Sequence, residues 1–113
     1  MTSTDIYGFE DDDLEGTRRI LESVFALKIE ARNSLYFGDY FIGITSGTQM
    51  LKLQRNLDPL HDPKDSPEER RLAPEHPSSA LLVYVSGSDL DSIRRMMEER
   101  IADIVFLRRD TVS

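Results

Sequence analysis

The sequence contains no cysteine, which excludes a disulfide framework and a zinc site built on thiolates. Its longest apolar run, residues 80–85, is far shorter than the roughly 20 residues that a helix needs to span a bilayer. The first residues, Met1 to Asp5, have neither the basic nor the apolar region of a signal peptide. We therefore expect a soluble, cytoplasmic protein that does not associate with membranes.

Histidine is scarce, and glycine-rich loops are missing. The two histidines, His61 and His76, both fall in a proline-rich stretch, and no glycine-flanked serine follows a predicted strand. A serine nucleophile needs a base within hydrogen-bond reach, so a catalytic triad is not expected. No phosphate-cradling glycine loop occurs either. The lack of a nucleophile–base pair and of a phosphate-binding loop predicts a protein without enzymatic activity and without a cofactor.

Positive charge is also sparse, since the formal net charge is −7. Residues 1–26 carry seven acids against Arg18 and Arg19, whereas residues 27–57 have a small basic excess. Most of this surface would repel a phosphate backbone, so nucleic acid is not an expected partner. A basic protein would be attracted to it. Solubility alone is an alternative explanation of the acidic composition.

The hydrophobic pattern predicts one domain over residues 1–113. Strands are expected over 6–9, 28–33, 39–45, 49–55, 80–85 and 104–107, with a helix over 13–26 and a second helix capped by Ser88. The predicted fold is α+β: one two-layer domain with a mixed β-sheet in the order β-α-β-β-β-loop-β-α-β and two helices packed on it, most simply on one face. The last strand, helix and strand are expected to form a right-handed parallel crossover.

Three consecutive acids, Asp11, Asp12 and Asp13, stand at the start of the first predicted helix. Asp12 is the expected cap, and Glu15 stands three residues later, at capping-box spacing. Negative charge is favourable at this positive end of the helix dipole. The acids therefore have a structural explanation, and they are also candidates for contact with a basic partner.

Residues 56–78 contain all five prolines of the chain, which predicts a long excursion without regular structure. Asp58, His61, Asp62 and Asp65 could be considered as metal ligands. Their spacing matches no calcium loop and no zinc pair, and Asp-Pro and His-Asp steps are common in turns. We expect no metal site there. The acids of this excursion are candidates for partner contact (Asp62, Asp65, Glu68 and Glu69).

Four of the nine aromatic residues lie within the segment 36–41. Phe41 is expected in the core, because Tyr40 and Phe41 point to opposite faces of their strand. Tyr36 and Phe37 precede Gly38 in a connection, where large rings suit contact with a partner. We therefore predict Tyr36 and Phe37 as apolar anchors of an interface.

Short runs along the chain resemble small immunity proteins of bacterial polymorphic and contact-dependent toxin systems. These runs are Tyr7-Gly8-Phe9, Asp13-Leu14-Glu15, residues 32–41 (RNSLYFGDYF), Leu53-Gln54-Arg55-Asn56 and residues 81–85 (LLVYV). The resemblance implies a cytoplasmic protein that binds and blocks a cognate toxin domain, often a nuclease, without catalysis. The candidate acids and the two rings named above would then meet a basic toxin surface.

The strand, helix and three strands at the start also resemble one unit of the vicinal oxygen chelate superfamily. That resemblance implies the alternative function, a small-molecule or metal-binding domain that acts as a dimer. The predicted strands carry no histidine, and Glu10 and Glu30 are the only acids near the strands where that superfamily places its ligands.

Overall fold

The described part of the chain alternates strands and helices in the predicted order. The structure, a computed structural model, describes residues 2–25, 28–34, 38–44, 50–56, 78–87 and 89–112. Its elements are β1 (Thr2–Phe9), α1 (Leu14–Phe25), β2 (Glu30–Ser34), β3 (Gly38–Ile44), β4 (Met50–Arg55), β5 (Leu81–Ser86), α2 (Leu90–Arg100) and β6 (Val105–Val112). The predicted α+β class is confirmed. All but the two ends of the predicted excursion over 56–78 lie outside the described residues.

The six strands form one sheet in the order β2-β3-β4-β5-β1-β6. Every neighbouring pair is antiparallel, so the prediction of a mixed sheet was wrong. The crossover from β5 through α2 does reach a parallel strand, β6, but β1 lies between the two. Residues 5–9 of β1 and 81–83 of β5 are all buried, and strands buried on both faces belong in the middle of a sheet.

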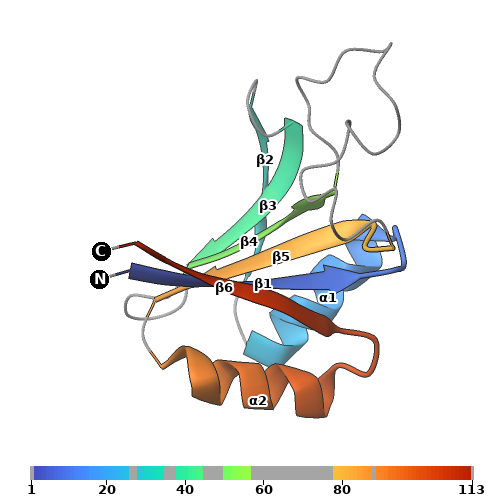
Figure 1. Ribbon diagram of the computed structural model, residues 1–113. Helices are drawn as coiled ribbons and strands as arrows, with labels where there is room; N and C mark the ends of the chain where they lie inside the picture. The colour runs from blue at the N-terminus through green and yellow to red at the C-terminus, as the bar shows by residue number, and fades with distance from the viewer. Residues whose placement is uncertain are drawn as a thin grey trace.

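Both helices lie on one face of the sheet, as expected (Figure 1). Alternate residues of the central strands, including Tyr7 and Val83, point to this face and pack against Leu21 of α1 and Met97 of α2. Leu90, Ile93 and Met97 of α2 are buried in this core, as is Ile101 directly after the helix. Phe41 of β3 also joins this core, as predicted.

The opposite face of the sheet, which we call the helix-free face because neither described helix lies on it, has a second, smaller cluster. Ile6 and Leu82 are buried there, and Tyr84 and Leu107 pack against them. Gly8 lies on this face too, and a Cβ built on it would be 2.2 Å from Ser79 Oγ and 3.2 Å from Leu107 Cδ1. Only glycine allows the segment before β5 to approach β1 so closely.

The helix starts differ from the expected ones by a residue or two. Asp13, rather than Asp12, caps α1: its Oδ1 accepts a hydrogen bond of 3.0 Å from the N–H of Gly16. Helix α2 begins at Leu90 after Asp89, whose φ of 59° is left-handed. The predicted cap of α2, Ser88, lies outside the described residues.

Candidate functional site

The acids before α1 form an exposed turn at one end of the sheet. Asp11 Oδ1 accepts a hydrogen bond of 2.9 Å from the N–H of Asp13, and the carbonyl oxygen of Asp12 accepts one of 3.4 Å from Arg55 Nη1. Glu10, Asp11, Asp12 and Asp13 are all exposed. The turn therefore holds four carboxylates in water, and Asp11 and Asp13 also shape the backbone that presents them.

A shallow hollow opens beside this turn, where the chain passes from α2 into β6. It has a volume of about 460 Å³ and is lined by Glu10, Asp11, Ala102, Asp103, Ile104 and Val105; we call it the acidic hollow. Val105 is 52% exposed, which is the highest value among the large apolar side chains that the structure describes as exposed. The hollow thus combines three carboxylates with one accessible apolar side chain.

The antiparallel pairing of β1 with β6 creates the acidic hollow. Gly8 near the end of β1 pairs with Val105 at the start of β6, so the turn after β1 and the turn before β6 meet. Sequence reasoning missed Asp103 and Val105, because no local pattern in the sequence shows that β1 pairs with β6. Once β1 is known to pair with β6, the register alone brings these residues to the acidic turn.

An ion-pair network ties the middle of β1 and β6 to the first turn of α2. Asp5 is fully buried, and both of its oxygens accept hydrogen bonds from Arg109, at 2.6 Å from Nε and 3.0 Å from Nη2. Arg109 Nη2 also donates to Asp91 Oδ1 of α2 at 2.8 Å. Hydrogen bonding to these two carboxylates raises the pKa of the Arg109 guanidinium. A buried carboxylate needs such a partner, so this network is structural.

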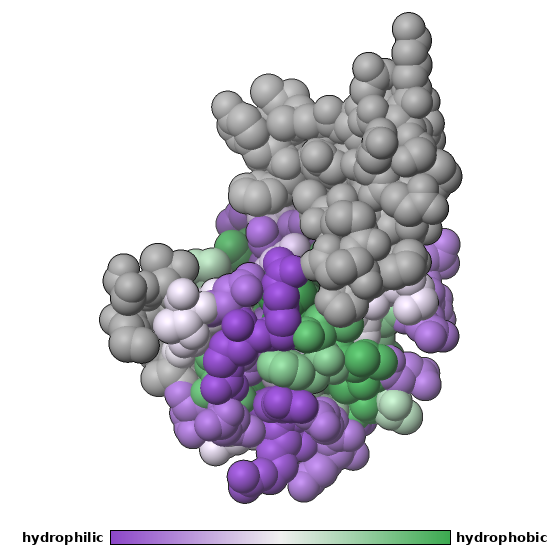
Figure 2. Space-filling view, viewed as in Figure 1, coloured by the Kyte–Doolittle hydropathy of each residue, from purple (hydrophilic) through white to green (hydrophobic). Residues whose placement is uncertain are grey.

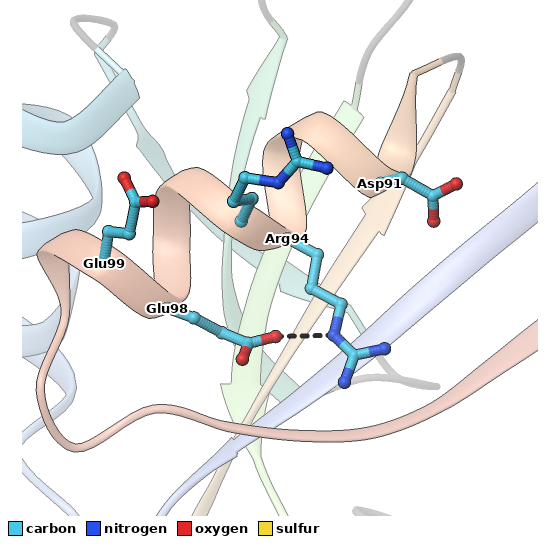
Figure 3. A pocket seen from close by; sticks show the side chains of 5 residues that line it. Asp91, Arg94, Glu98 and Glu99 are labelled. Carbon is cyan, nitrogen blue, oxygen red and sulfur yellow. Dashed lines mark hydrogen bonds and ion pairs between the residues drawn. The ribbon is translucent and has the colours of Figure 1, made fainter.

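The outer surface of α2 has a hollow of about 440 Å³ lined by Asp91, Arg94, Arg95, Glu98 and Glu99 (Figure 3). Arg94 and Glu98 are joined by an ion pair, which Figure 3 marks with a dashed line. The Arg94 guanidinium also lies 3.8 Å from the centre of the Phe106 ring. Charges of both signs alternate along this helix, so it has no single sign to attract a charged partner.

Lys52 occupies a third hollow, on the helix-free face. Thr4, Met50, Tyr84 and Ser86 line it together with Lys52, and its volume is about 230 Å³. Burial lowers the pKa of Lys52, and its Nζ lies 4.6 Å from the centre of the Tyr84 ring. The hydroxyls of Thr4 and Ser86 are 2.9 Å apart and share a hydrogen bond. Lys52 therefore packs over the Tyr84 ring and shields this part of the sheet, which is a structural role.

The predicted partner-binding residues divide into two groups. Asp11, Asp12 and Asp13 lie together at the acidic turn. The other six predicted residues, Tyr36, Phe37, Asp62, Asp65, Glu68 and Glu69, lie outside the described residues. Within the described ranges, no three His, Cys, Asp or Glu side chains form a group that could hold a metal ion. No helix in the described part of the chain is long and apolar enough to cross a membrane.

Fold and surface together define a small α+β domain whose most distinctive surface is an acidic hollow with an apolar side chain in it. The chain matches no protein-family model, and a comparison with curated proteins finds no match.

Proposed function

We propose that this chain is an immunity protein, which binds a basic toxin domain through the acidic hollow and neutralises it by occlusion, without catalysis. The observation that carries the proposal is that Glu10, Asp11 and Asp103 line one hollow together with the exposed Val105. The sequence resemblance to small immunity proteins supports the same function.

The hollow has the two properties that a tight electrostatic interface needs. Its carboxylates lie on a chain with net charge −7, so a basic surface would be drawn toward it before contact. Val105 adds an exposed apolar side chain to the lining that carries these charges, and apolar contacts that become buried on binding supply much of the affinity of an interface. A standard interface of roughly 1,600 Å² extends well beyond this hollow, so neighbouring surface would also take part.

The proposal is tested by co-expression with a candidate toxin. The C-terminal domain of a large secreted protein encoded immediately upstream would be produced in bacteria with and without this chain. We expect cells that produce the toxin domain to grow only when they also produce this chain. Continued toxicity, with both chains well expressed, would show that this chain is not the antidote to that toxin.

The role of the hollow is tested by charge removal at constant size. The hollow variant is Glu10→Gln/Asp11→Asn/Asp103→Asn, and the matched control is Glu30→Gln/Glu98→Gln/Glu99→Gln, which removes three exposed charges elsewhere. Asp11→Asn keeps the side-chain oxygen that accepts the hydrogen bond from the N–H of Asp13. Asp13 stays unchanged because it caps α1. At low salt, the hollow variant should bind the toxin domain roughly tenfold more slowly than the control, since steering depends on local charge. Equal association rates for the two variants would place the interface elsewhere.

A further inference from the structure

Strand β6 lies at one edge of the sheet formed by the described strands. It is eight residues long and, among the described strands, pairs only with β1. An edge strand of this length presents a row of backbone N–H and C=O groups that can pair with another strand. In the view of Figure 2, hydrophobic surface lies at the front, where Figure 1 places the first part of β6, and hydrophilic surface covers α2 below it.

Proteins often protect such edges with a bulge or with charges that point toward an incoming strand. The bulge of β6 is at Leu107, because Ile6 pairs with Arg108 and Tyr7 with Phe106. Beyond the bulge, residues 108–112 pair regularly with β1. Arg109 does not protect this part, because its guanidinium is held by Asp5 and Asp91 of its own chain.

The remaining charges of this segment are self-complementary. Arg108 and Asp110 lie opposite Ile6 and Thr4, so both point to the helix-free face, where they form an ion pair of 3.3 Å. In an antiparallel pair of two β6 strands with a two-fold axis at Arg109, each Arg108 faces Asp110 of the second copy. An axis at Arg108 would instead place two arginines opposite each other, and an axis at Asp110 two aspartates.

We propose that a second copy of this chain docks along the β6 edge, antiparallel and centred on Arg109, so that two sheets join into one. Two Arg108–Asp110 pairs between the copies extend the pair within each copy into a ring of four alternating charges. Opposite-charge pairs directly across an antiparallel ladder are favourable. The two Arg109 side chains meet at the axis, each already neutralised by two carboxylates. The proposal is argued from β6 alone and does not rest on toxin binding, although in this register Phe106 faces Val112 of the second copy and the interface ends beside Val105 of the acidic hollow.

The test is sedimentation velocity over a concentration series, with charge reversals as probes. The unaltered protein should sediment as a dimer at tens of micromolar. Arg108→Asp alone and Asp110→Arg alone should each weaken the dimer at least tenfold, because each places like charges opposite each other. The combined swap, Arg108→Asp/Asp110→Arg, should restore it. Thermal unfolding of each variant establishes that it is folded.

The matched control lies on the other edge of the sheet. Glu30 and Arg32 of β2 form the same kind of exposed pair, at 2.7 Å, two residues apart on an edge strand. Arg32→Asp and Glu30→Arg should leave the dimer unchanged. Because the chain has no cysteine, Arg108→Cys and Asp110→Cys proteins can also be mixed under oxidising conditions. The mixed disulfide should form faster than either disulfide between identical variants.

Three results would overturn the proposal. A monomer at every concentration up to several hundred micromolar would show that two copies do not pair through β6, and a strand of another protein would then be the remaining partner for that edge. A dimer that survives both single reversals, or that the β2 control disrupts, would have another interface. Failure of the combined swap, in a folded variant, would refute the register centred on Arg109.

Discussion

Gly8→Ala is the substitution whose effect the structure defines most sharply. The new Cβ would lie 2.2 Å from Ser79 Oγ and 2.9 Å from Ser79 Cβ, far inside van der Waals contact. Ser79 is itself 6% exposed, and the carbonyl oxygen of the same residue accepts a hydrogen bond from Asn56, so this segment has little room to retreat. Overpacking of this kind costs about 1–3 kcal/mol. In a chain of this size, that corresponds to a fall in melting temperature of roughly 4–12 °C.

Removing the obstruction should reverse the effect in steps. Ser79→Ala deletes the atom at 2.2 Å and leaves the one at 2.9 Å, so Gly8→Ala/Ser79→Ala should regain part of the loss. Gly8→Ala/Ser79→Gly should regain more, because the nearest remaining atom is Leu107 Cδ1 at 3.2 Å, the end of a flexible side chain. Calorimetry and urea unfolding of the single and double variants form a double-mutant cycle that isolates the contact.

Gly16→Ala is the matched control. A Cβ there would also be too close to a neighbour, 2.3 Å from Asp13 Oδ2, but that atom belongs to an exposed carboxylate. Rotation of Asp13 away from the new Cβ would weaken the cap of α1 and lower the free energy of unfolding by about 1 kcal/mol. The higher helix propensity of alanine raises the free energy of unfolding by a similar amount, so the two effects nearly cancel. We expect almost no net change in stability. If Gly8→Ala were as mild as Gly16→Ala, or if the Ser79 substitutions were additive with it, the close approach of Ser79 would not explain Gly8.

Two further predictions concern buried polar groups. Tyr7 is fully buried, and its hydroxyl has no hydrogen-bond partner in the described structure, so Tyr7→Phe should keep or raise stability at pH 7. Burial, reinforced by the negative charge of Asp5, raises the pKa of Tyr7 above its ordinary value of 10.0. Above pH 10 the unfolded state therefore loses this proton first, and stability falls as pH rises; urea midpoints between pH 8 and 11 should decline less for Tyr7→Phe than for the unaltered protein. Arg109→Met leaves the Asp5 carboxylate without its guanidinium and should lower the urea midpoint far more than Arg32→Met, which breaks an exposed pair. Equal losses for the two arginine variants would contradict the structural role of the buried pair.

Hydrophobic periodicity predicted each described helix and strand, but it predicted β1 and β6, the two strands that form the acidic hollow, as too short. It placed the first strand at 6–9 and the last at 104–107, whereas β1 spans Thr2–Phe9 and β6 spans Val105–Val112. The missing halves are polar and pair with each other, through Ser3 with Thr111 and Asp5 with Arg109. Neither half shows an apolar pattern alone, because each is stabilised by side chains from the other end of the sequence.

The prediction of the site was limited for the same reason, because the pairing of β1 with β6 leaves no local pattern in the sequence. The acidic turn was found from Asp11, Asp12 and Asp13, because a helix start is a local feature. The acidic hollow needs the α2–β6 turn beside it, and that placement depends on β1 entering the sheet between β5 and β6. Local pattern does not specify which strand is inserted between two others.

The position of β1 also has a consequence for how fast the domain folds. Among the described strands, β1 precedes the others in the sequence and pairs with β5 and β6, and the hydrogen bond between Ser3 and Thr111 joins residues 108 positions apart. Neither edge of β1 can form its native ladder until β5, and then β6, has been synthesised. Contacts between such distant residues require a long loop to close before they contribute any stability, so folding should take milliseconds to seconds rather than microseconds. During that interval β1 is the segment most exposed to pairing with the wrong strand, and the polar residues of its first half reduce its tendency to aggregate.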